Sequence, residues 1–269
     1  MMHKNLILSA LAGALMMTAV SESIAAGGVD VPRQEWSWDG IFGSFDRGEA
    51  QRGLQVYKEV CAGCHGLRHV AYRNLMQLGY TEDQVKAFAA EFEVTDGPND
   101  DGEMFDRPAR PADKFVNPFP NDNAARAGNN GALPPDLSLI VDARAYGMDY
   151  LLYPKGHQFG GADYVYGILT GYADPPTDVK VGENMNYNKY FAGNQIAMAP
   201  PLSEDAIEYT DGTKPTVEQM ARDVTTFLAW AAEPNLEQRK SMGIKVVLFL
   251  IVLLGLTIAV KKRIWANVH

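Results

Sequence analysis

Cys61-Ala62-Gly63-Cys64-His65 holds both cysteines of this 269-residue chain. The spacing Cys-x-x-Cys-His is typical of a haem c attachment site. Two thiols separated by two residues lie about one helical turn apart, so both can reach the vinyl groups of one porphyrin. The histidine that follows is then placed to bind the iron. We therefore predict one covalent haem c, with thioethers at Cys61 and Cys64 and with His65 as the first axial ligand.

Two other uses of a cysteine pair fit this sequence less well. A structural zinc site takes four Cys or His ligands, and the chain has no second cysteine pair. A thioredoxin-like redox pair follows a strand of a βαβ unit. Here the pair follows residues 47–60, where Leu54, Tyr57 and Val60 recur on one side of an expected helix. A plain disulfide is the remaining alternative, and haem c is favoured over all of these.

The first 26 residues have the pattern of a cleaved secretory signal peptide. Lys4 supplies the positive charge, residues 6–20 the apolar stretch, and Ser23-Ile24-Ala25-Ala26 the small-residue cleavage region. An apolar stretch of 15 residues is short for a membrane span. We expect cleavage after Ala25 or Ala26, which places a haem domain, residues 27–235, on the periplasmic side of a bacterial inner membrane.

Residues 236–269 have the pattern of a C-terminal membrane anchor. Residues 242–260 contain one charge, Lys245, and as a helix they would extend about 28 Å, close to the thickness of a bilayer core. Lys261, Lys262, Arg263 and Trp265 suit the far membrane boundary. We expect a single pass with a short cytoplasmic tail. A buried core helix is the alternative, although soluble domains seldom contain so long an apolar run.

Acidic residues dominate the part of the chain between signal and anchor. Residues 27–235 hold 17 basic and 31 acidic side chains, a net charge of −14. This balance argues against binding to nucleic acid and against a domain that lies on anionic lipid. It favours long-range attraction of a cationic partner. The alternative is that the acids only keep the domain soluble.

The pattern of helix signals predicts a mainly α class: a cytochrome c-like helical haem domain with long irregular loops. Asp46 or a neighbour should cap the helix over 47–60. Thr81-Glu82-Asp83-Gln84 forms a capping box for a helix to about Phe92. Further helices are expected over residues 164–170 and from Pro215 through Ala232.

Three other segments are expected to lack regular structure. Residues 37–45 are aromatic and broken by glycine, which indicates a packed N-terminal arm. Residues 91–106 hold seven acids and no base, which is typical of an exposed loop. Residues 107–135 are rich in Pro, Asn and Gly and should wrap irregularly around a rigid object. Strand signals are weak throughout.

The second axial ligand decides whether the iron is closed or open to small molecules. His69 is too near His65 to reach the opposite face of the ring, but His157 could serve as a His/His ligand. Met198 lies in Gln195-Ile196-Ala197-Met198-Ala199-Pro200-Pro201, where small residues and a double proline restrict the loop. A methionine ligand would raise the reduction potential relative to histidine. On the residues alone, Met198 and His157 both stay open.

Several segments are shared with one known family. They are Gly40-Ile41-Phe42-Gly43, residues 52–60 before the haem motif, residues 129–138, residues 163–166 with Thr170-Gly171-Tyr172, residues 196–201 and residues 227–234. Together they resemble the cytochrome c1 family, the haem subunits of ubiquinol–cytochrome c oxidoreductase (cytochrome bc1) complexes. The resemblance covers essentially all of the chain after the signal peptide.

The resemblance implies roles for individual residues. It implies thioethers at Cys61 and Cys64, and His65 and Met198 as the two axial ligands. It further implies that Arg144 and Tyr164 lie near the haem propionates, where a cation and a phenol would offset the carboxylates. Residues 145–159 look like an insertion relative to shorter members. Bacterial relatives often carry an additional disulfide, for which this chain has no cysteines left, so packing and proline must stiffen the Met198 loop.

The resemblance also implies a function and partners. Single electrons would pass from a Rieske iron–sulfur protein to a soluble cytochrome c, beside cytochrome b in a dimeric complex that oxidises ubiquinol. The chain alone is not expected to transform a substrate. A tethered peroxidase or gas-binding cytochrome with an open iron is one alternative, and Met198 ligation argues against it. A tethered monohaem carrier for a terminal oxidase is another, and copurification with cytochrome b distinguishes that case.

Overall fold

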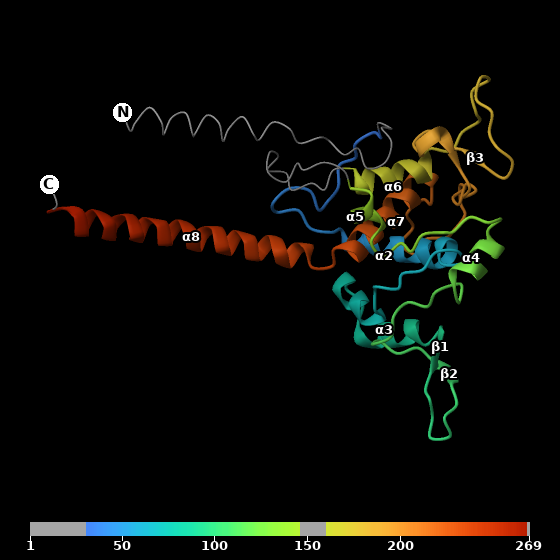
Figure 1. Ribbon diagram of the computed structural model, residues 1–269, viewed down its shortest axis with the longest axis horizontal. Helices are drawn as coiled ribbons and strands as arrows, with labels where there is room; N and C mark the ends of the chain where they lie inside the picture. The colour runs from blue at the N-terminus through green and yellow to red at the C-terminus, as the bar shows by residue number, and fades with distance from the viewer. Residues whose placement is uncertain (1–30, 146–159, 268–269) are drawn as a thin grey trace, which may run out of the picture.

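The computed structural model describes residues 31–145 and 160–267. The expected signal peptide, His157 with nearly all of the expected insertion, and the C-terminal His269 lie outside the described residues. The described chain forms a helical domain with two small antiparallel sheets and one long projecting helix, α8 (Figure 1). This confirms the mainly α class.

The elements follow one another in this order. They are α2 (Arg47–Val56), a π-helical turn (Tyr57–Cys61), a 3-10 helix (Tyr72–Leu78), α3 (Glu82–Ala89), β1 (Glu93–Asp96), β2 (Phe105–Pro108), α4 (Asp122–Gly128), α5 (Ile140–Ala143), α6 (Gly161–Thr170), β3 (Asn186–Tyr187), a 3-10 turn (Ala192–Asn194), β4 (Gln195–Ile196), α7 (Val217–Ala232) and α8 (Leu236–Trp265).

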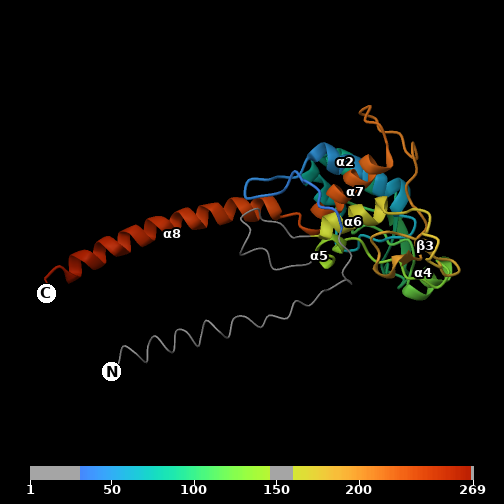
Figure 2. The same cartoon turned by 90° about the horizontal axis from the view of Figure 1, so that it is seen from above.

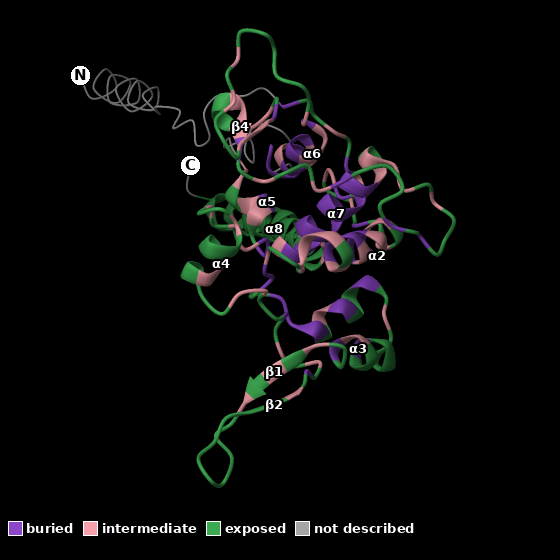
Figure 3. Cartoon of the chain, turned by 90° about the vertical axis from the view of Figure 1, so that its right-hand side faces the viewer, coloured by how far each residue is buried: buried purple, intermediate pink, exposed green. Residues whose placement is uncertain are grey.

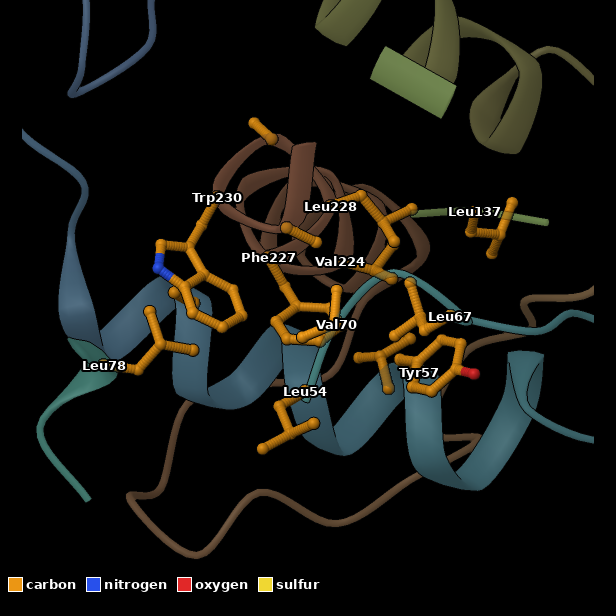
Figure 4. Packing of buried hydrophobic residues seen from close by; sticks show 14 of the residues in the cluster. Leu54, Tyr57, Leu67, Val70, Leu78, Leu137, Val224, Phe227, Leu228 and Trp230 are labelled. Atoms are coloured by element: carbon orange, nitrogen blue, oxygen red, sulfur yellow. The ribbon is translucent and has the colours of Figure 1, made fainter. Parts of the chain in front are cut away.

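The centre of the core is the crossing of α2 and α7. Leu54 of α2 and Tyr57, which directly follows α2, pack near Val224 and Phe227 of α7, and Trp230 of α7 lies beside Leu78 (Figure 4). The two helices touch closely because α2 has a glycine at the crossing: a Cβ on Gly53 would lie 2.0 Å from the Asp223 carbonyl oxygen. Figure 3 shows buried residues in these two helices, in α6 and in the segment between α2 and α3.

One buried ion pair accompanies this crossing. Asp223 has no exposed side-chain surface, and its two carboxylate oxygens each lie 3.0 Å from a guanidinium nitrogen of Arg52. Arg52 also binds Asp211 at 2.9 Å. A planar guanidinium suits this paired geometry, which fixes the rotation of α2 against α7.

Three of the predicted helix starts are confirmed by their caps, whereas the helix expected over residues 164–170 begins earlier, at Gly161. Asp46 accepts from the Glu49 N–H, Thr81 forms its box with Gln84, and Thr216 accepts from the Gln219 N–H. The helix after Thr81 ends at Ala89 rather than near Phe92. Phe92 instead stacks on Tyr72, with ring centroids 5.5 Å apart, and leads directly into β1.

Residues 93–108 form a hairpin, so the expected exposed loop is limited to residues 97–104 between its two strands. β1 pairs with β2 in antiparallel register from Glu93 opposite Pro108 to Asp96 opposite Phe105. Arg107 binds both Asp96 and Asp113, so one cation neutralises two of the surrounding carboxylates. These cross-strand and loop pairings join positions that no local sequence pattern connects.

Two other expectations need correction. Residues 107–135 are not wholly irregular, because the Asn121 side chain caps the short helix α4. The N-terminal arm is buried only at the two ends of its loop, which together form the base of the arm. Trp36, Trp38 and Phe45 are buried there, whereas Phe42 is 86% exposed.

Helix α8 is apolar along most of its length and projects away from the domain in Figures 1 and 2. It is 30 residues long, and none of its most apolar 18-residue window is buried against the rest of the chain. It therefore does not serve as a buried core helix. A helix of this length and composition fits a single membrane span.

Candidate haem site

The two cysteines lie on a turn that is shaped by a change of helical type. After Val56 the α-helix widens to a π-helical turn, in which the Ala62 N–H donates to the Tyr57 carbonyl at 2.8 Å. The Cys61 carbonyl then accepts from the N–H groups of Cys64 at 3.1 Å and His65 at 2.9 Å. Such π turns occur frequently at functional sites. The sequence pattern predicts a helix here but not this widening.

Both thiols are free of disulfide bonds. Cys64 is exposed, whereas Cys61 is half-buried against the core. Burial raises the pKa of the Cys61 thiol to about 12, and the neighbouring Cys64 adds to this effect. The Cys61 thiol is therefore protonated at neutral pH.

His65 is held so that one ring nitrogen stays available. Its Nδ1 lies 2.7 Å from the Pro135 carbonyl oxygen. A carbonyl can only accept, so Nδ1 carries the proton and Nε2 keeps its lone pair. Burial lowers the pKa of His65, and the contact with Pro135 and the charge of Asp136 oppose that effect. A neutral imidazole with a free Nε2 is the form that binds haem iron.

Further contacts hold this turn against residues 135–138. The Tyr57 hydroxyl donates to the His65 carbonyl at 2.9 Å, and the Leu137 N–H donates to the Gly66 carbonyl at 2.8 Å. At Gly66 a Cβ would lie 2.2 Å from the Asn117 side-chain oxygen. A larger residue immediately after His65 would therefore require the Asn117 side chain to move.

Met198 lies directly after β4, in the loop that ends in Pro200 and Pro201. Its side chain is half-buried. Its backbone carbonyl accepts from the Tyr172 hydroxyl at 3.0 Å and from the Asn186 amide at 3.4 Å. Two donors thus hold the loop. Sequence reasoning missed both of them, although Tyr172 lies in one of the segments that carry the family resemblance.

A buried asparagine connects this loop to α6. Asn188 has no exposed surface, and its amide donates to the Ile168 carbonyl at 2.8 Å. Its side-chain oxygen accepts from the Tyr190 N–H at 3.0 Å. A buried amide that satisfies both its donor and its acceptor fixes a loop in one arrangement. Hydrogen bonds thus add to the packing and proline that the sequence predicts as the source of rigidity in the Met198 loop.

Arg144 and Tyr164 contact each other. The Arg144 guanidinium carbon lies 5.7 Å from the centre of the Tyr164 ring, a cation–π geometry that joins the end of α5 to α6. Burial raises the pKa of Tyr164, while the charge of Arg144 partly opposes this. The phenol is therefore a neutral hydrogen-bond donor at physiological pH.

The chemistry of these residues fits a haem. The described chain offers two free thiols three residues apart, a neutral imidazole with one free nitrogen, a thioether in a loop held by two hydrogen bonds, and an arginine–tyrosine pair suited to carboxylates. The contacts of these residues form three separate groups: the haem turn (residues 61–65) with residues 135–138, the Met198 loop with Tyr172 and Asn186, and Arg144 with Tyr164. A helical domain with this motif and one long apolar helix defines a class, the membrane-tethered cytochromes.

The chain matches the Cytochrome C1 family over residues 36–268, and it belongs to that family. Cytochrome c1 of Rhodospirillum rubrum is 46% identical over 282 residues, covering 98% of both chains. Cytochrome c1 of Saccharomyces cerevisiae mitochondria is 46% identical over 253 residues, covering 94% of this chain and 77% of that protein. Cytochrome b/c1 of Bradyrhizobium diazoefficiens is 49% identical over 267 residues, which cover 96% of this chain but only 39% of that protein.

Membership of this family gives the chain a general role. It is a haem-binding subunit of a cytochrome bc1 complex and takes part in electron transfer.

Proposed function

We propose that this chain carries one covalent haem c and passes single electrons from the Rieske iron–sulfur protein to a soluble cytochrome c. The observation that carries the proposal is the Cys61–His65 turn, where two free thiols precede an imidazole whose Nδ1 is bound by the Pro135 carbonyl. When bound, the haem supplies a one-electron iron couple. The protein's part is to hold the iron closed to substrates and to set its potential.

Each site residue has a role in this proposal. Cys61 and Cys64 would hold the haem through thioethers, and His65 and Met198 would bind its iron. Met198 would favour the reduced iron relative to a second histidine. The Tyr172 hydroxyl, by holding the Met198 carbonyl at 3.0 Å, keeps the loop in position. Arg144 and Tyr164 would offset the charge of the haem propionates.

The chain is arranged around one membrane. Residues 1–26 act as a cleaved signal peptide, residues 27–235 as the haem domain on the periplasmic side, and residues 236–269 as the anchor. Residues 242–260 of α8 cross the bilayer, and the tail lies in the cytoplasm. Cytochrome b packs beside α8, a proposal supported by the joint name of the Bradyrhizobium relative. The assembled complex is a dimer.

The hairpin contributes an acidic surface for the acceptor. Lys58 and Arg107 neutralise Glu91 and Asp96 near its base. Asp100, Asp101 and Glu103 lie exposed near its tip, which extends away from the domain in Figure 1. A basic soluble cytochrome would be attracted to such a projecting negative surface.

The test is expression of the tagged full chain in a bacterium that attaches haem c and contains the other subunits. We expect haem to remain on the chain in a denaturing gel, and cytochrome b and the Rieske protein to copurify with it. The double variant Cys61→Ser/Cys64→Ser should lose the covalent haem. Haem released by denaturation would contradict thioether attachment, and copurification with an oxidase in place of cytochrome b would assign the relay to a different complex.

A further inference from the structure

The N-terminal arm ends in an apolar tip that the haem domain does not cover. Phe42 is 86% exposed and Ile41 is 48% exposed. The base of the same arm is buried, where Trp36 stacks on Trp38 with centroids 4.8 Å apart and Trp38 contacts Phe45 at 5.2 Å. The Gly40–Gly43 tip, defined as Gly40-Ile41-Phe42-Gly43, therefore projects from a rigid base.

The tip has a defined shape. Gly40 has a φ of 71°, in the left-handed region that favours glycine. A Cβ on Gly43 would lie 2.0 Å from the Asp39 carbonyl oxygen, so this position accepts only glycine. The Ser44 N–H donates to the Ser37 carbonyl at 3.1 Å and closes the loop. The exposure of Phe42 is thus built into an ordered turn.

The first two turns of α8 hold this arm. Lys240 donates from Nζ to the carbonyl oxygens of Trp38 and Gly43, the latter at 3.1 Å. One carboxylate oxygen of Glu237 accepts from the Phe45 N–H at 2.9 Å. In both Figures 1 and 2 the blue segment that precedes α2 runs beside the start of α8. These contacts therefore fix the position of the tip along the axis of α8.

This position along α8 coincides with the expected boundary between the bilayer and water. Lys240 precedes the proposed span by two residues, a rise of about 3 Å along the helix axis. Gly43 is bound by the Lys240 ammonium, which holds it within one lysine side-chain length of the expected headgroup level, with Phe42 as its neighbour. Interfacial depth is where aromatic and long apolar side chains anchor membrane proteins.

From this geometry we propose that the Gly40–Gly43 tip is a second membrane contact, in which Ile41 and Phe42 enter the boundary between headgroups and acyl chains. The inference rests on the proposed anchoring by α8. Two points of attachment, joined through Lys240 and Glu237, fix the tilt of the haem domain relative to the membrane. A lipid surface is favoured over a protein partner because two side chains are far fewer than a stable protein interface uses.

The test uses nitroxide accessibility in the full haem-loaded chain, alone in phosphatidylcholine nanodiscs and within the purified complex. Because the haem takes both native thiols, Ile41→Cys provides a single labelling position and leaves Phe42 intact. Met104→Cys on the exposed hairpin is the aqueous control, and Leu254→Cys in α8 is the lipid control. We expect the ratio of oxygen to water-soluble nickel accessibility at position 41 to exceed that at 104 severalfold, as at 254.

Each other result overturns the inference in a distinguishable way. A label at position 41 that behaves like the one at 104, while position 254 is in lipid, leaves the anchor intact and rejects the second contact. An aqueous label at 254 rejects the proposed anchor itself, and the second contact with it. A label at 41 that is shielded from both reagents in the complex means that another subunit covers the tip.

Discussion

The two proposed axial ligands are both positioned through backbone carbonyls. Pro135 offers its carbonyl to His65 Nδ1, and the Met198 carbonyl is itself held by Tyr172 and Asn186. Because these contacts join residues up to 70 positions apart, they cannot be inferred from local spacing. The motif predicts that His65 is a ligand, but not how its ring is oriented.

Tyr172→Phe tests how the Met198 loop is held. Loss of one hydrogen bond should destabilise the folded arrangement of the Met198 loop by about 1 kcal/mol. Because the loop is then easier to displace, the methionine should leave ferric iron at a lower pH than in the unmodified chain. The measurement is the pH at which the far-red methionine–iron absorbance disappears. Tyr80→Phe, a half-buried tyrosine outside this loop, is the control and should leave that pH unchanged. Equal midpoints for both variants and the parent chain would deny Tyr172 this role.

At the scale of elements, the close crossing of α2 and α7 determines where the haem turn lies, because that turn directly follows α2. Sequence pattern located both helices and their caps, because helical periodicity and capping residues are local signals. It could not show the π turn after Val56, the hairpin over residues 93–108 or helix α4. These features depend on contacts such as the stacking of Phe92 on Tyr72, which only the folded chain brings together.

Gly53→Ala tests the helix crossing. The added methyl would lie 2.0 Å from the Asp223 carbonyl oxygen, so the helices must separate, and we expect a loss of about 3 kcal/mol in unfolding free energy. Gly48→Ala on the same helix meets only side-chain atoms at 3.2 Å and beyond, and should be neutral or slightly stabilising. Denaturant unfolding of the two haem-loaded variants measures the difference. Equal stability of the two variants would contradict the close crossing.

The hairpin should loosen in acid through its arginine. Arg107 lowers the pKa of Asp113 and of Asp96 below the ordinary value of 3.8. Because the folded pKa is lowered, this stabilisation is present above the ordinary pKa and is lost as pH falls through the lowered one. Hydrogen exchange of residues 93–108, corrected for intrinsic rate, should therefore accelerate below about pH 3.8. Arg107→Gln should exchange rapidly at pH 6 already; slow exchange in that variant would show that the ion pairs do not hold the hairpin.

At the scale of the whole molecule, the sequence located the long apolar helix correctly, since a run of this length is a local property. It did not show that the base of the N-terminal arm is bound to Glu237 and Lys240, or that Phe42 remains exposed. Aromatic composition indicates burial on average. Which aromatic side chains are covered depends on where the chain returns to meet them.

The distribution of acidic residues predicts which surface of the domain attracts the acceptor protein. Neutralising the hairpin tip with Asp100→Asn, Asp101→Asn and Glu103→Gln should slow electron transfer to a basic soluble cytochrome c by up to roughly tenfold at low salt. The difference should disappear at high ionic strength. The control triple Asp174→Asn, Asp178→Asn and Glu183→Gln removes the same charge from another exposed segment. Equal slowing by both triples would assign the attraction to net charge rather than to the hairpin.

The most direct test of the account is the visible spectrum of the haem-loaded full chain, oxidised and reduced, with carbon monoxide added to the reduced form, beside Met198→Leu. The account predicts a weak far-red band in the oxidised chain, no response to carbon monoxide, and loss of that band with a lower reduction potential in the variant. Binding of carbon monoxide by the unmodified chain would contradict a closed iron held by His65 and Met198.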